Sequence, residues 1–191
     1  GWVTLNAAVN STAELEFHTH MLVTVGNSTE AALLRWLYRA GLSYWELRDL
    51  HPPVFQELFD SNKKQMSTVI TLAGRLIVLV KGAPEIVARR CNPPPDLSHI
   101  QTLAGRAMRT LAFAHADMPA DGSDPPCLIW DGYVGIRDIV RPDVPDAVRT
   151  CNEAGITVKM VTGDSPETAM AIARETGILT SGAVMLGSGF R

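Results

Sequence analysis

The run Gln65-Met-Ser-Thr-Val-Ile-Thr-Leu72 is separated from Leu76-Ile-Val-Leu-Val-Lys81 by the turn Ala73-Gly74-Arg75. Both runs are rich in β-branched and aliphatic residues, and the glycine between them marks a tight turn. This pattern predicts an antiparallel hairpin. Capping residues, apolar spacing and helix-ending Gly and Pro residues predict further elements on both sides of it. Strands are expected at 13–17, 20–25, 110–115, 128–130 and 133–136, and helices at 4–9, 29–40, 43–50, 84–90 and 97–108.

The last part of the chain follows a different pattern. Ile156-Thr-Val-Lys-Met-Val161 is an apolar, β-branched run that is typical of a parallel strand buried on both faces. Helices are predicted before it, at 145–154, and after it, at 166–175. A strand, a turn and a helix in this order indicate an α/β protein. We therefore expect an α+β domain at 1–137, with an antiparallel sheet and flanking helices, and an α/β segment at 138–191.

Composition excludes several classes of protein. The chain of 191 residues is 46% hydrophobic, which is enough for a globular core. Lys and Arg number 17 against 20 Asp and Glu, and this net charge of −3 argues against a nucleic-acid partner. No apolar run approaches the roughly 18 residues of a membrane-spanning helix. Three scattered cysteines favour a reduced, cytosolic setting, and the absence of an initiator methionine leads us to expect a piece of a longer protein.

The turn Thr162-Gly163-Asp164 is the first candidate site. In an open α/β sheet, ligands bind at the carboxyl ends of strands, where the next helix offers free N–H groups to an anion. Thr162 suits a hydrogen bond to a phosphoryl oxygen. Asp164 suits a nucleotide hydroxyl or a magnesium-bound water. An ordinary turn in which Asp164 or Ser165 caps the helix explains the same residues.

Two further candidates flank the hairpin. Lys81 ends an apolar strand and is followed by Gly82, so a cation and a closely approaching backbone meet there. Phe59, Lys64 and Met66 combine an aromatic face, a cation and a polarizable sulfur, which suit an adenine ring. The alternatives are a lysine that only protects a strand end and a core phenylalanine beside solvated lysines.

Arginines mark two boundaries between elements. Arg109 suits a bidentate contact with phosphate or a pair with a neighbouring carboxylate. Asp138 and Arg141 lie at the expected domain boundary, where they suit a hinge, a phosphate contact by Arg141 or a plain surface salt bridge. His18 and His20 have no third ligand nearby, so no metal site is expected. The sequence contains no G-x-x-x-x-G-K-[ST] and no G-x-G-x-x-G motif, which argues against the usual nucleotide-binding folds.

Together these motifs resemble the cytoplasmic part of type II P-type cation-transporting ATPases, and most closely the calcium pumps. The segment Gly26-Asn-Ser-Thr-Glu-Ala-Ala-Leu33 is similar to the family's G-x-x-T-E-x-A-L, which implies that Glu30 lies at the adenine site. A second segment resembles F-x-S/R…K-x-M-S. This resemblance implies that Phe59 stacks on adenine and that Lys64, beside Met66, lines the pocket.

The resemblance continues to the end of the chain. Lys81-Gly-Ala-Pro-Glu85 matches K-G-A-P-E, which implies that Lys81 and Gly82 line the nucleotide pocket. Arg109-Thr-Leu-Ala112 resembles R-x-L-A, whose arginine contacts phosphates. The pair Asp138 and Arg141 resembles the D-P-P-R hinge, with Ile and Val in place of the prolines. Thr162-Gly163-Asp164 matches the family's T-G-D segment in the phosphorylation domain.

The resemblance implies an ATP-driven ion pump. In the full protein, ATP with Mg²⁺ phosphorylates an aspartate, and the phosphoenzyme drives the transport of a cation, here Ca²⁺. The motif D-K-T-G-T that carries this aspartate does not occur in the sequence, so the chain is expected to bind ATP without turnover. Segment 138–191 is then an incomplete piece of the haloacid dehalogenase-like (HAD-like) Rossmannoid phosphorylation domain. The implied partners are the missing phosphorylation, actuator and transmembrane domains of the same polypeptide, at the cytoplasmic face of a membrane.

Two other functions fit the same sequence. The first is a stand-alone nucleotide-sensing or partner-binding module with no role in transport, which explains the missing catalytic motif without truncation. The second is a soluble phosphatase of the haloacid dehalogenase type. It is disfavoured because it also needs a D-x-D/T nucleophile motif. The transported ion is inferred from resemblance alone, so magnesium, sodium/potassium and proton pumps are alternatives to a calcium pump.

Overall fold

The computed structural model of the chain describes residues 1–18, 21–104, 106, 108–137, 140–163, 166–180 and 185. The chain divides into two compact units. Unit 1 consists of residues 1–97 and 111–134, and unit 2 consists of residues 98–110 and 135–191. The expected domain boundary between residues 137 and 138 stays a prediction.

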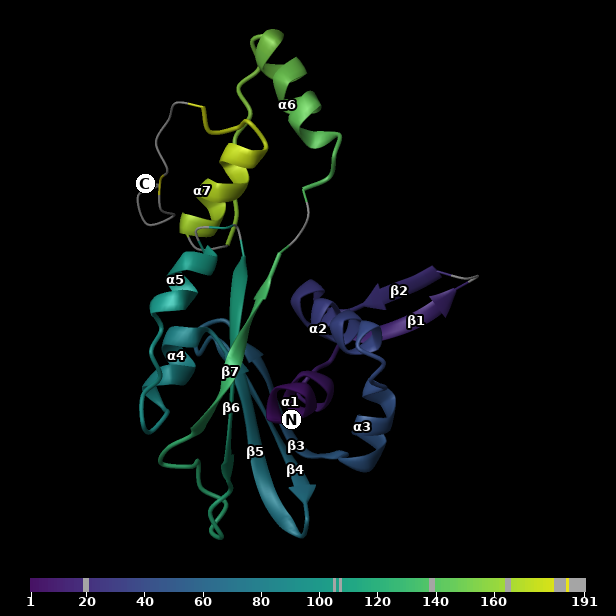
Figure 1. The fold of residues 1–191 in the computed structure, drawn as a ribbon, viewed down its shortest axis with the longest axis vertical. Coiled ribbons are helices and arrows are strands. Elements are labelled where there is room, and N and C mark those ends of the chain that lie inside the picture. The colour runs from purple at the N-terminus through teal and green to yellow at the C-terminus, as the bar shows by residue number, and fades with distance from the viewer. Residues whose placement is uncertain are drawn as a thin grey trace. The chain divides into compact units, whose positions relative to one another are not determined.

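A five-stranded sheet in the order β3-β4-β5-β6-β7 lies mainly in unit 1 (Figure 1). The pairs β3–β4, β4–β5 and β5–β6 are antiparallel, so the predicted hairpin forms the centre of the sheet. In this register Met66 lies opposite Lys81, and Leu79 lies opposite His115. The strands are β3 (Pro53–Asp60), β4 (Gln65–Leu72), β5 (Arg75–Gly82), β6 (Arg109–Asp117) and β7 (Ile129–Ile136).

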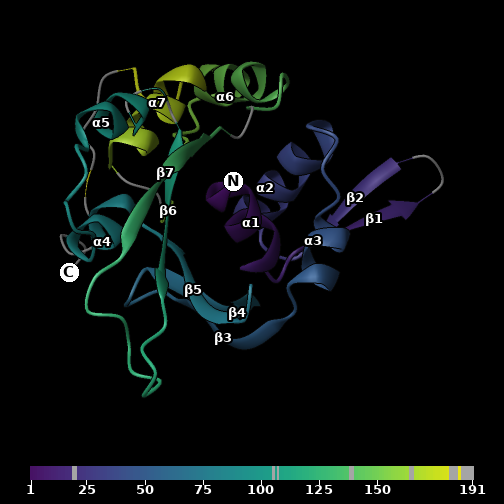
Figure 2. The ribbon, with the colours of Figure 1, turned by 60° about the horizontal axis from the view of Figure 1, so that its bottom comes forward.

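Helices cover both faces of the central strand β5 (Figure 2). On one face, Val78 and Val80 pack in a cluster with Val87 of α4 (Pro84–Arg89). On the other face, Asn6 of α1 (Trp2–Val9) donates to the carbonyl oxygens of Val80 and Ala114, at 2.9 and 3.2 Å. Because both faces are buried, β5 is apolar at successive positions rather than at alternate ones.

Three helices and a hairpin complete the N-terminal part of unit 1. Helices α1, α2 (Ser28–Arg39) and α3 (Tyr44–Leu50) pack against one another. The buried face of α2 carries leucines three and four positions apart, at 33, 34 and 37. Strands β1 (Glu14–His18) and β2 (Met21–Val25) form a two-stranded antiparallel sheet.

An aromatic stack connects the start of α1 to strand β6. The Trp2 ring stacks on the His115 ring, with 3.8 Å between the ring centroids. His115 Nδ1 lies 2.7 Å from Asp131 Oδ1 on β7. Burial raises the pKa of Asp131, and His115 offsets this effect only in part. The N-terminal helix is thus anchored on β6 through an aromatic stack.

Unit 2 contains α5 (Ser98–Ala104), α6 (Val144–Glu153) and α7 (Pro166–Glu175). Arg137 donates through Nη2 to both carboxylate oxygens of Glu175, at 3.0 and 2.9 Å. Thr168 Oγ1 donates to the carbonyl oxygen of Met108 at 3.4 Å. These bonds attach α7 to the segments that enter and leave the sheet.

One predicted strand is wrong. Residues 156–161 have no strand structure, and the side chains of Ile156 and Val161 are 58% and 95% exposed. A parallel strand is stable only beside neighbouring strands, to which it donates and from which it accepts hydrogen bonds. Among the residues that the structure describes, no strand pairs with this segment. The apolar pattern therefore predicts a strand, but the described residues include no neighbouring strand with which it could pair.

Two further elements differ from the prediction. Strand β3 was not predicted, because Pro52-Pro53 indicates a helix end and the strand carries apolar side chains on both faces. Proline is tolerated there because β3 is an edge strand and Pro53 is its first residue. The helix expected at 97–108 is present over Ser98–Ala104. No helix within the described ranges has the length and apolar character that a bilayer crossing requires.

Candidate functional site

Most of the predicted site residues lie at one end of the sheet in unit 1. Strand β4 begins, and strand β5 ends, where Met66 pairs with Lys81. Strand β3 ends at the same place, because its last residue, Asp60, pairs with Gln65. The structure thereby brings the ends of three strands together. The predicted residues at this end are Phe59, Lys64, Met66, Lys81 and Gly82.

A buried ion pair joins this end of the sheet to helix α2. Lys81 Nζ lies 2.6 Å from Glu30 Oε1, and the two side chains are only 5% and 8% exposed. The sequence motifs placed both residues at one pocket, and the structure shows their side chains in contact. Burial lowers the pKa of the Lys81 ammonium, and the neighbouring Glu30 carboxylate offsets this only in part.

The second carboxylate oxygen of Glu30 is also bonded. Oε2 accepts from Thr12 N at 2.9 Å, from Thr12 Oγ1 at 2.9 Å and from Ala13 N at 3.1 Å. Burial by itself raises the pKa of a carboxyl, but Lys81 and the Thr12 donors outweigh it and lower the pKa of Glu30. Glu30 is therefore an ionised, fully bonded carboxylate at neutral pH.

Helix capping explains why Glu30 stands where it does. Asn27 is the N-cap of α2, and its side chain accepts from Thr29 N and Glu30 N at 2.9 and 3.3 Å. Glu30 is thus in the first turn of the helix, where unpaired N–H groups favour a negative charge. The sequence Gly26-Asn-Ser-Thr-Glu30 therefore contains both the N-cap residue, Asn27, and the carboxylate, Glu30.

Gly82 is required by a close approach of two backbones. A Cβ atom at this position would lie 2.5 Å from the carbonyl oxygen of Lys64. That same oxygen accepts a hydrogen bond from Ala83 N at 3.0 Å. Lys64 has a left-handed φ of 50° and closes the turn after β3 by donating to the Asp60 carbonyl oxygen at 2.6 Å. The glycine therefore lets the Lys64 turn lie against the end of β5.

The remaining unit 1 residues differ in accessibility. The Phe59 side chain is 59% exposed, so it is not a core phenylalanine, and its ring face is accessible to a planar ligand. Lys64 is likewise exposed. Met66 is only 1% exposed and packs inside the unit. Its predicted place at the nucleotide stays a prediction.

The other predicted residues lie in unit 2. Arg109 is the first residue of β6. Arg141 Nη2 donates to Asp143 Oδ2 at 3.2 Å, in an exposed pair. Thr162 and Gly163 lie in the segment between α6 and α7. Asp138 and Asp164 are outside the described residues. The roles expected for all of these residues stay predictions.

Sequence motifs missed the residues that support Glu30 and the sheet. Thr12 and Ala13 act largely through backbone N–H groups, which every residue except proline supplies, so no residue type identifies them. Asn6 and Asn10 did carry a signal, since two amides four positions apart, one in α1 and one at its C-cap, stand in a largely apolar stretch. Asn10 Nδ2 donates to the Met66 and Leu79 carbonyl oxygens, each at 3.3 Å.

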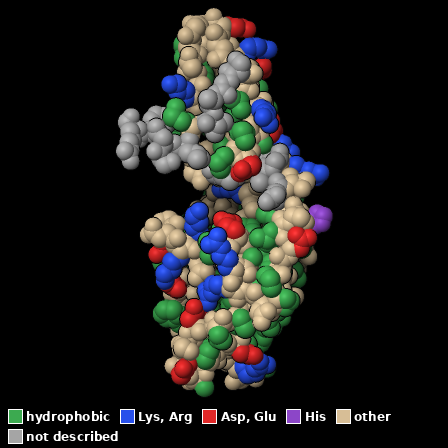
Figure 3. Space-filling model, turned by 90° about the vertical axis from the view of Figure 1, so that its left-hand side faces the viewer, with side chains coloured by type: hydrophobic (Ala, Val, Ile, Leu, Met, Phe, Trp, Pro, Cys, Tyr) green, Lys and Arg blue, Asp and Glu red, His purple; other side chains and the backbone are tan. Residues whose placement is uncertain are grey.

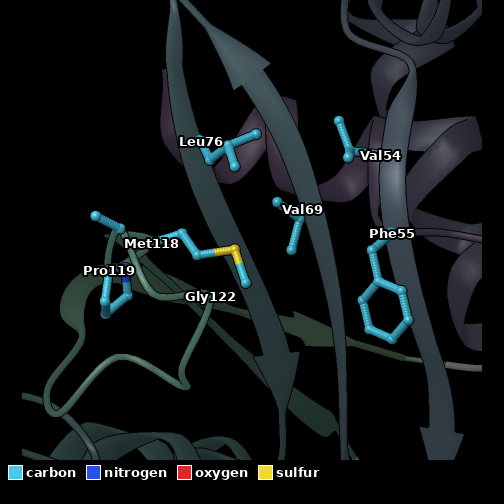
Figure 4. A pocket seen from close by; sticks show the side chains of 8 residues that line it. Val54, Phe55, Val69, Leu76, Met118, Pro119 and Gly122 are labelled. Atoms are coloured by element: carbon cyan, nitrogen blue, oxygen red, sulfur yellow. The ribbon is translucent and has the colours of Figure 1, made fainter.

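An apolar pocket of about 390 Å³ lies elsewhere on unit 1. Figure 4 shows its walls on β3, β4, β5 and the loop after β6. Leu76 places it toward the start of β5, whereas Lys81 lies near the end of that strand. The pocket has no charged side chain to bind a phosphate, so it is not the candidate site. Its lining residues are Val54, Phe55, Val69, Leu76, Met118, Pro119, Ala120 and Gly122.

Surface charge agrees with the composition. On the face that Figure 3 shows, Lys and Arg side chains are interspersed with Asp and Glu side chains. Several of the basic side chains of unit 1 are paired, such as Arg90 with Asp124 and Arg75 with Asp117. Mixed charge of this kind does not favour a polyanion such as nucleic acid.

Comparison with known proteins identifies the family. The family model described as P-type ATPase, cytoplasmic domain N, matches residues 2–93, and that described as haloacid dehalogenase-like hydrolase matches residues 57–188. The α+β unit with its antiparallel sheet and the HAD-like character of the rest of the chain are thus confirmed.

Curated relatives agree with both matches. The chain is 37% identical to the calcium-transporting ATPase PAT1 of Dictyostelium discoideum, over 96% of the chain and 18% of that protein. It is 39% identical to the plasma membrane-type calcium-transporting ATPase 2 of Arabidopsis thaliana, over 85% of the chain and 18% of that protein. It is 38% identical to the plasma membrane calcium-transporting ATPase 1 of Gallus gallus, over 83% of the chain and 16% of that protein.

The chain spans less than a fifth of the length of these relatives, and the match runs along most of the chain in each case. The two matching family models overlap in the hairpin that ends at Lys81, so one continuous sequence carries both. The chain therefore belongs to the P-type cation-transporting ATPases.

Proposed function

We propose that unit 1 binds ATP and that the chain is the nucleotide-binding part of a calcium-transporting ATPase. The observation that carries the proposal is the buried pair between Lys81 and Glu30, next to the exposed ring of Phe59 and the exposed Lys64. A planar base needs an apolar face, and phosphates need cations, so this end of the sheet offers what a nucleotide requires. The relatives described above are calcium-transporting ATPases, which supports calcium as the transported ion.

Each residue has a definite part in the proposed complex. The Phe59 ring stacks on adenine, and Lys64 places a mobile ammonium beside it. Lys81 supplies a positive charge that Glu30 holds in place, and Gly82 lets the Lys64 turn lie against the end of β5. Arg109 binds phosphate oxygens through its planar guanidinium. Mg²⁺ accompanies the phosphates and neutralises part of their charge.

In the full protein, the proposed reaction is phosphoryl transfer to an aspartate. A carboxylate oxygen attacks the γ-phosphorus, the bond from that phosphorus to the β,γ-bridging oxygen breaks, and ADP leaves. Thr162, Gly163 and Asp164 contact the transferred group, and Asp138 with Arg141 forms the hinge. The resulting phosphoenzyme drives Ca²⁺ transport by a membrane domain, with this chain at the cytoplasmic face. Because the sequence contains no D-K-T-G-T motif, the chain itself binds ATP without hydrolysing it.

Titration of the chain with ATP and Mg²⁺, followed by NMR, tests the proposal. Part of the phosphate site belongs to missing domains, so we expect a Kd of about 1 mM, or about −4 kcal/mol. Phe59→Ala is the most informative variant because its side chain is exposed and its loss does not disturb the core. Loss of one base–aromatic stack costs about 1–3 kcal/mol, so Kd should rise at least fivefold.

The neighbouring Leu58→Ala is the matched control. Its side chain is 60% exposed, close to the 59% of Phe59, so the two truncations differ mainly in the loss of the aromatic ring. Lys81→Ala needs a check of folding first, because it leaves Glu30 buried without its cation, which costs about 3–5 kcal/mol. Absence of binding at several millimolar ATP by the folded chain would refute ATP binding and favour the stand-alone partner-binding module.

A further inference from the structure

Arg48 on α3 contacts the segment that binds Glu30, and it belongs to none of the motifs of the candidate site. Its guanidinium donates to three backbone carbonyl oxygens. Nε donates to Ala8 at 2.8 Å, and Nη2 donates to Ser11 at 3.1 Å and to Ala13 at 2.9 Å. These carbonyls belong to the last turn of α1 and to the segment that follows it. We propose that Arg48 is a positioning residue, which orients segment 11–13 so that its N–H groups hold Glu30 against Lys81.

One peptide plane connects Arg48 to Glu30. The Ser11 carbonyl and the Thr12 N–H belong to the same peptide unit, and in a trans peptide they point in opposite directions. The carbonyl accepts from Arg48 at 3.1 Å, and the N–H donates to Glu30 Oε2 at 2.9 Å. This plane is therefore clamped between a cation on one side and an anion on the other. Any rotation of the plane weakens both bonds.

Ala13 provides a second connection, through the two peptide units on either side of its Cα. Its N–H donates to Glu30 Oε2 at 3.1 Å, and its carbonyl accepts from Arg48 at 2.9 Å. Gly26, which lies just before the N-cap of α2, leaves room for this segment, because a Cβ there would lie 3.1 Å from the Ala13 Cα. The two charged groups thus act on the same three residues from opposite sides.

The guanidinium itself is held firmly. Its Cζ lies 4.7 Å from the centroid of the Tyr44 ring, a cation–π distance. Tyr44 is 1% exposed, and its hydroxyl accepts from Leu15 N at 2.8 Å. Arginine suits this position because its planar fork serves three acceptors at fixed angles, whereas a lysine ammonium is a point charge on a flexible stem.

The consequence for ligand binding rests on the proposed function. Without Arg48, segment 11–13 loses its fixed orientation, and Glu30 loses the donors that hold it beside Lys81. We expect Arg48→Met to raise the Kd for ATP about five- to tenfold, within the usual range for residues in one hydrogen-bond network. Arg48→Lys should fall between Arg48→Met and the wild type. Arg75→Met removes the same charge from an exposed pair with Asp117 and should leave Kd unchanged.

A double-mutant cycle separates positioning from general destabilisation. If Arg48 acts through Glu30, adding Arg48→Met to Glu30→Gln should change Kd by less than about twofold, since the carboxylate it positions is already gone. Fully additive effects would overturn the proposal. Far-UV circular dichroism identifies which variants are folded. If Arg48→Met unfolds, the same cycle is run with Arg48→Lys.

The backbone amides of Thr12 and Ala13 give a readout that needs no nucleotide. In the wild type their ¹⁵N–¹H shifts should follow the ionisation of Glu30, at a pKa below 4.5. In Arg48→Met the two amides should shift, and the titration should move toward 4.5. If the wild type binds no ATP, the proposed function fails while these shifts still test the clamp. Unchanged amide shifts and an unchanged titration in the folded variant would overturn the positioning role.

Discussion

Single residues at the end of the sheet are constrained by backbone contacts as much as by ligand chemistry. Gly82 leaves space for the Lys64 carbonyl, and Glu30 accepts from the Thr12 and Ala13 backbone. A motif such as K-G-A-P-E therefore combines a charge for the ligand with a glycine for the fold. Both kinds of constraint predict measurable effects of substitution.

Gly82→Ala should destabilise unit 1. The new Cβ would lie 2.5 Å from the Lys64 oxygen and 2.9 Å from the Gln65 Cα, and backbone atoms cannot move aside as a flexible side chain can. We expect a loss of about 1–3 kcal/mol in unfolding free energy, as for other overpacked sites. Urea denaturation measures it. Gly163→Ala adds a Cβ with nothing within 4 Å and serves as the control.

Glu30 should make the unfolding free energy of the chain depend on pH in the acidic range. Its pKa is lowered from the ordinary value of 4.5, so the folded state binds this proton less readily than the unfolded state. The stabilisation is complete above pH 4.5 and is lost as the pH falls through the folded-state pKa. Glu30→Gln should therefore show a shallower decline in unfolding free energy below pH 4.5. Glu85→Gln changes an exposed carboxylate and should keep the wild-type slope.

At the scale of elements, local patterns predicted most helices and the central hairpin. Residues 65–81 carry their own turn and their own pairing partner, so the hairpin could be recognised without the rest of the fold. Strand β3 and residues 156–161 could not be predicted in this way. The first has an apolar side chain on each face and begins with proline, and the second lacks a neighbouring strand among the described residues.

The candidate site was predictable to a similar degree. Glu30, Phe59, Lys81 and Gly82 stand in motifs with a clear physical reason. The contact between Glu30 and Lys81 joins residues 51 positions apart, and only the tertiary fold creates it. The roles of Thr12 and Arg48 depend on backbone carbonyls and N–H groups, which the sequence does not distinguish.

The connection between α1 and the sheet should be sensitive to a single amide. Asn10 donates to Met66, Leu79 and Asn6 and accepts from Thr68 Oγ1 at 2.8 Å. Asn10→Ala removes all four of these bonds, and each buried polar group that loses its partner costs about 1–3 kcal/mol. We expect at least 2 kcal/mol of destabilisation by urea unfolding. The exposed Asn62→Ala should change stability by less than about 0.5 kcal/mol.

At the scale of the whole molecule, stability should be distributed unevenly. Strand β5 is buried on both faces and bonded on both edges, so its amides can exchange only when the sheet opens. Residues 156–161 belong to no strand, and most of their side chains are exposed. Hydrogen–deuterium exchange of the intact chain should show the slowest amides in β5 and near-unprotected exchange at 156–161. Strong protection at 156–161 would contradict the structure there.

The stack of Trp2 on His115 makes the N-terminal helix optically distinct. The emission of an indole depends on the groups in van der Waals contact with it, so the emission of Trp2 should change when its stack with His115 opens. Of the four tryptophans in the chain, Trp2 is therefore the one whose fluorescence reports whether α1 is seated on β6. The difference between the wild-type and Trp2→Phe emission spectra isolates that signal, so the chain carries its own spectroscopic probe of the interface beneath its candidate site.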